Sequence, residues 1–191
     1  MNNLIEAGTV LCEQYSGSFV NVIEECNKSA VTLIEIVTSK FSSFRDEKIF
    51  RETRVCFYKR AQILIADTWA CFEGFSHGEF HDIGELTMFA DYRVPQALLF
   101  LKTIEYSEEL CKSIRDGYVL PSGSAEEMEI RGCSIHVVEL LRKEITVLLG
   151  EANMDTALNS VIIDFYLWDY ATENKEEMKG FPEHRTRSIF Y

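Results

Sequence analysis

One stretch of the chain, residues 87–96 (TMFADYRVPQ), places a carboxylate, a phenol and a guanidinium side by side. Pro95 disfavours helical geometry at Val94 but suits the first turn of a new helix. The stretch therefore predicts a helix that ends at residue 91 or 92, a tight corner, and a second helix through residues 97–101. Asp91 is then held at the corner, where its carboxylate can point into a cleft and do chemistry. Alternatively, Asp91 pairs with Arg93 or caps the following helix.

A second acidic side chain, Asp164, lies on the last predicted helix, which runs from about residue 159 to 174. Trp168 follows one helical turn later, so the two side chains share a face. A buried unpaired charge is costly, and Asp164 therefore needs a partner. That partner is either a positively charged group of a ligand or Arg185 or Arg187 of the C-terminal segment.

Lys59 lies at the start of a helix predicted over residues 57–72, away from the apolar stripe of that helix. The residue types alone favour a lysine whose stem packs against the protein while its ammonium group reaches water.

Metal binding is not predicted, and neither is a cofactor. His77 and His81 have a spacing that suits metal binding on a helix, and two carboxylates lie nearby. The glycine-rich, polar segment 74–82 predicts a loop instead, and it offers no further ligands.

Helices are expected to position these residues. Apolar residues recur at the helical period over most of the chain, and no pair of strands and no internal repeat is evident. We expect an all-α fold, with one domain over residues 1–191 and about seven to nine helices. Residues 1–50 are expected to form a helical packing region, and residues 51–191 to bear the pocket.

A turn at residues 120–123 (LPSG) lies between two predicted helices. This arrangement is remotely similar to the helix-hairpin-helix of base-excision glycosylases. Ser124 and Glu127 predict a capping box at the start of the second of these helices.

Composition limits the classes of partner. The chain has 191 residues, of which 47% are hydrophobic and 26% charged, which is typical of a globular protein with a real core. Its net charge of −12 argues against duplex binding, which needs a basic face. A small nucleotide needs only a local basic pocket.

Cysteine usage and hydropathy indicate the compartment. The six cysteines are scattered without a Cys-x-x-Cys pair, which predicts reduced, mostly buried thiols. No signal pattern precedes the first helix, and no apolar run is long enough to cross a membrane. We expect a soluble cytoplasmic protein that does not contact membranes.

Several longer motifs resemble a known family. These motifs are FADYRVPQ (89–96), FYKRAQILIADTW (57–69), EIRGCSI (129–135), FYLWDY (165–170) and HRTRSIFY (184–191). On these motifs the chain is similar to the queuosine salvage family, whose members are queuosine 5′-phosphate N-glycosylases. The resemblance covers only the C-terminal part of the family pattern, because a sizeable N-terminal portion of a typical member has no counterpart before Met1.

The resemblance implies a hydrolase that cleaves the N-glycosidic bond of queuosine 5′-phosphate and releases queuine for salvage into tRNA queuosine modification. Its partners are then a small nucleotide and queuine. The reaction passes through an oxocarbenium-like sugar, which a carboxylate stabilises. A 7-deazaguanine base has no N7, so the leaving base cannot be activated by protonation there. The carboxylate is therefore expected to contribute more to catalysis.

The resemblance also assigns roles to residues. Asp91 is expected to be the catalytic carboxylate, with Phe89 and Tyr92 bounding the base. Asp164 and Trp168 are expected to contact the edge or the face of the base.

Polar contacts complete the expected site. Lys59, within FYKR, is a candidate for hydrogen bonding to the base or the phosphate. The 5′-phosphate is expected to be held by Arg131, by Arg185 or by the N-terminal portion of the family that has no counterpart here. The other interpretations of Arg131 are an ion pair with a neighbouring helix and a role in orienting Asp91.

Two other classes of function remain open. The first is a catalytically silent, truncated helical protein that binds queuine or a partner without turnover. The second is a DNA or RNA glycosylase, which needs a basic groove that this composition hardly provides. Direct contact with nucleic acid is therefore not expected, and the sequence leaves the oligomeric state open.

Overall fold

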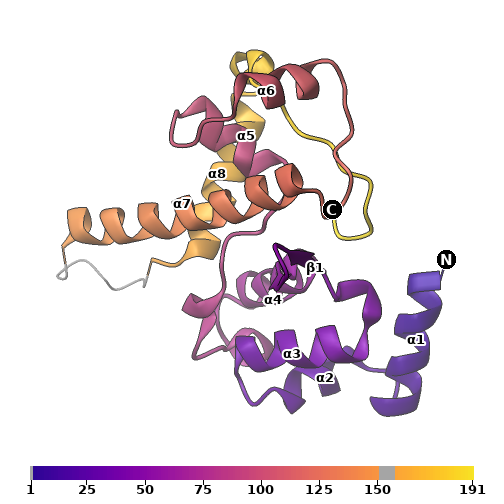
Figure 1. Cartoon of the computed structure of the whole chain (residues 1–191). Helices are drawn as coiled ribbons and strands as arrows, with labels where there is room; N and C mark the ends of the chain where they lie inside the picture. Colours follow the sequence, from indigo (N-terminus) through magenta and orange to yellow (C-terminus); the bar gives the residue numbers. More distant parts are fainter. Residues whose placement is uncertain (1, 151–157) are drawn as a thin grey trace. The chain divides into compact units, whose positions relative to one another are not determined.

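The computed structural model of the chain describes residues 2–150 and 158–191. Its described part is mostly helical, as predicted, and Figure 1 shows the helices along the chain. The α-helices of these ranges are α1 (Asn2–Gln14), α2 (Phe19–Glu25), α3 (Ala30–Lys40), α4 (Lys59–Cys71), α5 (Arg93–Phe100), α6 (Glu108–Arg115), α7 (Ala125–Leu149) and α8 (Ser160–Glu173). The 3-10 turns are η1 (Ser42–Phe44), η2 (Ser76–Gly78), η3 (Ile83–Glu85) and η5 (Glu177–Gly180).

The all-α prediction is wrong at one place, where β1 (Glu47–Phe50) and β2 (Thr53–Cys56) pair in a two-stranded sheet. Arg51 and Glu52 form the turn and have φ values of 46° and 68°. Two left-handed residues are what a type I′ hairpin turn requires. The usual signal for this turn, Asn-Gly or Asp-Gly, is missing, and four-residue strands give too short a pattern to recognise.

The described chain divides into two compact units. The first comprises residues up to Glu47, residues 58–86 and Phe190. In it α2, α3 and α4 pack together. Fully buried side chains in these helices include Val22, Leu33, Val37 and Ile65.

A remote carboxylate fixes the start of α3 in this unit. Asp82 accepts hydrogen bonds from the hydroxyl of Ser29 at 2.7 Å and from the backbone N–H of Ala30 at 2.5 Å. Burial raises the pKa of Asp82, but these hydrogen bonds outweigh that effect and the net pKa is lowered. Asp82 therefore holds the loop that follows α4 against the N-terminus of α3.

The second unit comprises residues 48–57, 87–189 and 191. Here α5 packs on α8 and on α7. Their shared core contains buried side chains from all three helices and from the segment before α5, among them Met88, Val94, Leu98, Val138 and Leu167. This core is the support on which the candidate site is built.

Side-chain caps define where the two long helices of this unit begin. The hydroxyl of Ser124 accepts the N–H of Glu127 at 3.3 Å, so the predicted cap of α7 is confirmed. The carboxylate of Glu127 accepts the N–H of Gly123 at 2.9 Å, one residue earlier than in a regular capping box. Asn159 caps α8 by accepting the N–H of Ile162 at 3.0 Å.

Two sequence expectations concern the thiols and membrane contact. All six cysteines are free, but the prediction that they are mostly buried is wrong, because only Cys26 is buried and four others are exposed. Scattered cysteines carry no pattern that indicates which helix face they occupy. Among the described helices, none is both long and apolar enough to span a bilayer.

Candidate functional site

The backbone before Asp91 is irregular and buried. The predicted helix ending at residue 91 or 92 is wrong, because residues 86–92 form no helix. Met88 and Ala90 are fully buried, so their apolar character reflects a segment that runs through the core. The second helix is confirmed as α5, but it begins at Arg93, so Val94 is helical although it precedes Pro95.

Asp91 lies at the N-terminus of α5 and is 8% exposed. Its Oδ1 accepts the N–H of Arg93 at 2.9 Å and the N–H of Val94 at 3.0 Å. The positive end of the helix suits a carboxylate at this position. Of the alternatives drawn from the sequence, capping of the following helix is therefore present in the structure, and it fixes the orientation of the carboxylate.

Charged side chains of two helices hold the segment before Asp91. Asp164 of α8 accepts the N–H of Phe89 at 2.7 Å. Arg131 of α7 donates from Nε to the carbonyl oxygen of Ala90 at 3.0 Å. Both side chains are almost completely buried. Backbone groups buried outside helices and strands need such partners, so α7 and α8 together determine where Asp91 lies.

Arg131 belongs to a buried network that also holds the backbone beside Asp91. It forms an ion pair with Glu127 at 3.2 Å, on its own helix and one turn away. Its guanidinium lies 4.0 Å from the ring centroid of Phe57 and 5.0 Å from that of Tyr191. The ion pair with Glu127 lies within α7, and the ion pair with a neighbouring helix that the sequence suggested stays a prediction. These contacts hold the guanidinium of Arg131 in the interior of the protein, which argues against Arg131 as a phosphate ligand.

The C-terminal motif HRTRSIFY completes this network. The hydroxyl of Tyr191 donates to Glu127 at 2.7 Å and lies 3.3 Å from Nε2 of His184. Burial, and then the charge of Arg131, lowers the pKa of His184 to about 4. Burial also raises the pKa of Tyr191. The hydrogen bond of Tyr191 to Glu127 thus docks this segment onto α7.

The aromatic residues predicted to bound the base differ in exposure. Phe89 is 4% exposed and packs edge-on against Phe165, with ring centroids 5.9 Å apart. Tyr92 and Trp168 are 38% and 46% exposed, so their rings are accessible to a ligand. Asp164 and Trp168 share α8, but only the carboxylate points into the core.

Lys59 is the first residue of α4 and is half-buried. Tyr58, directly before it, has a φ of 48°, which is uncommon for a bulky residue and marks a strained backbone. The hydroxyl of Tyr58 donates to Glu47 at 2.5 Å. The start of α4 is thus held in one conformation, and the role of Lys59 in binding stays a prediction.

Two pockets of the second unit lie beside the stretch that contains Asp91. The first, of about 430 Å³, is lined by Tyr92 together with residues 183–188 and Tyr191. The second, of about 680 Å³, has five basic side chains in its lining, namely Arg93, Arg115, Lys175, Lys179 and Arg185. Arg185 is exposed and lines both pockets.

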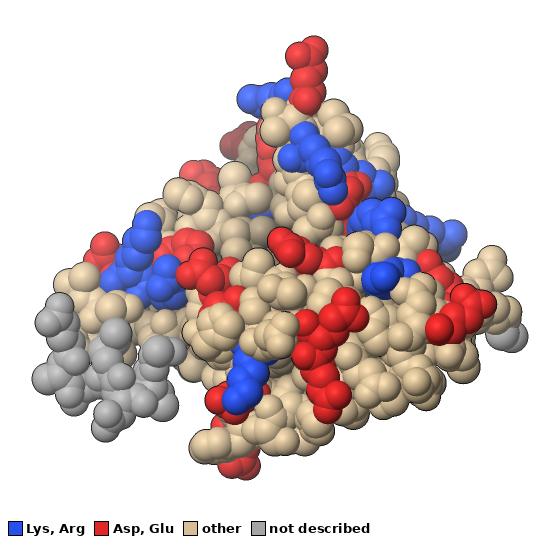
Figure 2. All heavy atoms as spheres, turned by 90° about the horizontal axis from the view of Figure 1, so that it is seen from below, with Lys and Arg blue, Asp and Glu red and all other residues tan. Residues whose placement is uncertain are grey.

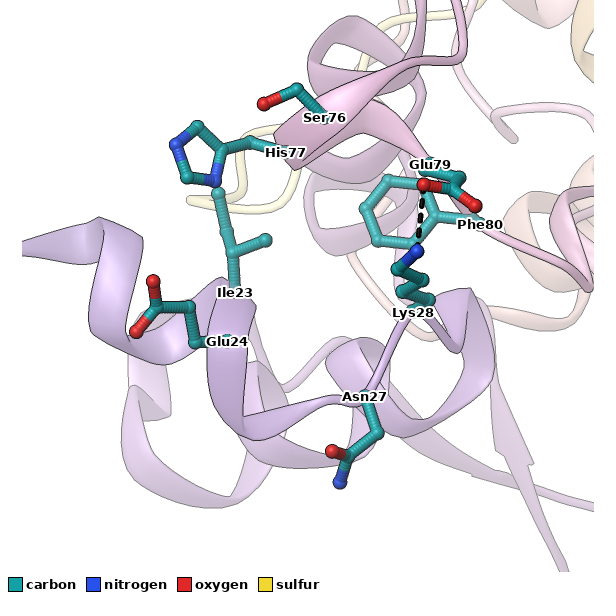
Figure 3. A pocket seen from close by; sticks show the side chains of 8 residues that line it. All are labelled: Ile23, Glu24, Asn27, Lys28, Ser76, His77, Glu79 and Phe80. Atoms are coloured by element: carbon teal, nitrogen blue, oxygen red, sulfur yellow. Dashed lines mark hydrogen bonds and ion pairs between the residues drawn. The ribbon is translucent and has the colours of Figure 1, made fainter.

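A pocket of about 350 Å³ in the first unit is shown in Figure 3. Lys28 and Glu79 point toward one another in it and form an ion pair at 2.7 Å. His77 also lines it, and its ring packs edge-on against Phe72 at 5.5 Å. Within the part of the chain that the structure describes, no three His, Cys, Asp or Glu side chains group in a way that could hold a metal.

Comparison with known proteins identifies the family. A family model described as queuosine salvage protein matches residues 1–191. The chain is 49% identical to a protein of Mus musculus over 189 residues, 48% identical to one of Nematostella vectensis over 198, and 46% identical to one of Bos taurus over 190. All three are named queuosine 5′-phosphate N-glycosylase/hydrolase, and the matches cover 98–99% of this chain.

The same matches cover 56–57% of the relatives, so the chain spans little more than half of their length. The resemblance drawn from the motifs is confirmed over the whole of this sequence. The chain belongs to the queuosine salvage protein family.

Proposed function

We propose that this chain carries the catalytic centre of a hydrolase that cleaves the N-glycosidic bond of queuosine 5′-phosphate and releases queuine. The observation that supports this most directly is the fixed carboxylate of Asp91. It is buried, its Oδ1 accepts two N–H groups of α5, and the backbone before it is held by α7 and α8. A preorganised carboxylate is what an oxocarbenium-like transition state requires.

In the proposed reaction, Asp91 lies beside the anomeric carbon. Its negative charge stabilises the positive charge that develops on the sugar as the bond to the base breaks. The same carboxylate orients the water that attacks this carbon. Because the 7-deazaguanine ring has no N7 to protonate, stabilisation of the positively charged sugar accounts for more of the decrease in the activation free energy.

The base is proposed to lie against accessible aromatic rings. Tyr92 and Trp168 are accessible enough to contact the base, whereas Phe89 supports the site from within the core. Asp164 holds the backbone of Phe89 and is proposed to place an acidic group near the cationic amine of queuine. Lys59 is proposed to make a polar contact with the base or the phosphate.

The 5′-phosphate is proposed to bind Arg185. Arg131, the other arginine considered, is 1% exposed and is engaged by Glu127 and by the carbonyl of Ala90. Arg185 is exposed and lines two pockets, one of which also contains Tyr92. Arginine suits phosphate because its donors form charge-assisted hydrogen bonds.

We propose one helical domain of the queuosine 5′-phosphate N-glycosylase type over residues 1–191, with the packing region in 1–50 and the pocket in 51–191. A small nucleotide is the proposed partner, without direct contact with nucleic acid. The remote likeness to helix-hairpin-helix glycosylases and the cytoplasmic location stay predictions.

The test is release of queuine. The purified 191-residue chain is incubated with queuosine 5′-monophosphate, and free queuine is measured by mass spectrometry. Asp91→Asn keeps an oxygen that can accept the two N–H groups, so it should fold and lose turnover. Asp169→Asn, an exposed change on α8, is the matched control and should keep turnover.

Two results would contradict the proposal. Turnover retained by Asp91→Asn would remove Asp91 as the catalytic carboxylate. No release by the folded wild-type chain would favour the catalytically silent alternative.

A further inference from the structure

A separate cavity of about 250 Å³ lies in the second unit, between the segment after α5, the start of α6 and the first turns of α7. Its apolar lining includes Leu110 and Ile130. Both belong to a small core that also contains Ile114 and Leu120. The volume is below the usual range for drug-sized ligands, so the cavity fits a smaller molecule with one ring.

The charged part of the lining has a single sign. Three carboxylates line the cavity, those of Glu105, Glu126 and Glu129, and no Lys or Arg is part of the lining. Glu126 and Glu129 are three residues apart on α7 and so lie on one face. Glu129 has an exposed ion pair with Arg51 at 3.2 Å, which leaves the other two carboxylates as the main negative groups.

Tyr106 supplies an independent observation. Its ring lines the cavity and packs on the small core, while its hydroxyl oxygen is buried and has no hydrogen-bond partner among the described residues. Burial raises the pKa of this phenol, so the group remains a donor at neutral pH. The phenol is therefore uncharged, and the face of its ring suits contact with a cation.

We propose that this cavity binds a small organic cation with an apolar ring. The ring lies against Leu110 and Ile130, and the ammonium group faces Glu105 and Glu126. The face of Tyr106 adds a cation–π contact. The site does not include any of the residues proposed for hydrolysis, so it stands independently of the proposed function.

The probe for the test is 2-phenylethylamine, and 2-phenylethanol is its uncharged counterpart of similar shape. Cys133 reports on the site, because it lines the cavity and is exposed. Alkylation of the full chain by iodoacetamide is followed peptide by peptide with mass spectrometry. We expect the amine to slow alkylation of Cys133 several-fold in a saturable way, and to leave the exposed Cys71 of α4 unchanged.

Matched charge variants test the carboxylates. In the double variant Glu105→Gln and Glu126→Gln, the amine concentration for half protection should rise about tenfold. Glu108→Gln with Glu109→Gln removes the same charge from exposed positions of α6 that do not line the cavity, and should leave protection unchanged. Equal protection by the alcohol, equal loss in both double variants, or no protection of Cys133 would each overturn the proposal.

Discussion

Asp164 shows how one residue can anchor a site from a distance in the sequence. Its carboxylate accepts the N–H of Phe89 at 2.7 Å in the core. Replacing it with alanine leaves that donor unsatisfied, so Asp164→Ala should lower the free energy of unfolding by about 2 kcal/mol or more. Asp164→Asn keeps an acceptor and should cost less. Urea denaturation measures both, with the exposed Asp169→Ala as a control expected within about 0.5 kcal/mol of wild type. Similar losses for the two alanine variants would contradict the anchoring role.

If the proposed function holds, Arg185 binds the 5′-phosphate of the substrate. Loss of one charge-assisted hydrogen bond in Arg185→Gln should raise KM for queuosine 5′-phosphate about tenfold. If the contact is made equally in the ground and transition states, kcat should change little. Steady-state kinetics with the dephosphorylated nucleoside should show no difference from wild type. Arg142→Gln, outside both pockets, is the control; an equal effect on both substrates would exclude Arg185 as the phosphate ligand.

His184 predicts how stability depends on pH. Its pKa is about 4 in the folded protein, against an ordinary value of 6.5, because it is buried near Arg131. On acidification the unfolded chain takes up this proton first, so the stabilisation is complete above pH 6.5 and is lost as pH falls toward 4. This group alone should lower the free energy of unfolding by about 2–3 kcal/mol across that window. Urea denaturation at several pH values should give a shallower slope for His184→Gln. The same slope in both proteins would contradict the prediction.

The sequence predicted features that depend on residues close together along the chain, but not the contacts between residues far apart in it. Asp91 was visible because the aromatic and basic residues beside it and Pro95 lie within a few positions. The contact of Arg131 with Ala90, and that of Tyr191 with Glu127, join residues 41 and 64 positions apart. No periodicity links such pairs, and only the tertiary fold brings them together.

The turn of the β1–β2 hairpin has a strained backbone, and the free-energy cost of this strain can be measured. Glu52 has a φ of 68°, a conformation that costs an L-residue about 1 kcal/mol and glycine almost nothing. Glu52→Gly should therefore raise the free energy of unfolding by about 0.5 kcal/mol, after the added flexibility of the unfolded chain is subtracted. Thermal or urea denaturation measures this change. Glu105→Gly, where φ is not positive, should lower stability, and a loss at both positions would contradict the prediction.

Helices with local signals were predictable, whereas irregular elements were not. Ser124 and Asn159 cap α7 and α8 as their residue types suggest. By contrast, the segment before Asp91 has the apolar composition of a helix and yet is not one. Its N–H and carbonyl groups are satisfied by α7 and α8, which makes the irregular backbone stable and is invisible in the segment itself. The hairpin was missed because its turn lacks the usual glycine.

For the whole molecule, the net charge bears on which class of ligand can approach it. The net charge is −12, and on the face shown in Figure 2 acidic and basic side chains are interspersed among uncharged ones. A net charge of this sign disfavours the approach of a folded tRNA, whereas a single nucleotide needs only one basic pocket. If the proposed function holds, the chain should release queuine from queuosine 5′-monophosphate and none from intact tRNA that contains queuosine. Mass spectrometry of free queuine measures both reactions.

Digestion of the same tRNA by a nuclease that leaves 5′-monophosphates should restore release, which controls for the amount of queuosine. Release from intact tRNA at a comparable rate would show that a polynucleotide reaches Asp91 despite the charge.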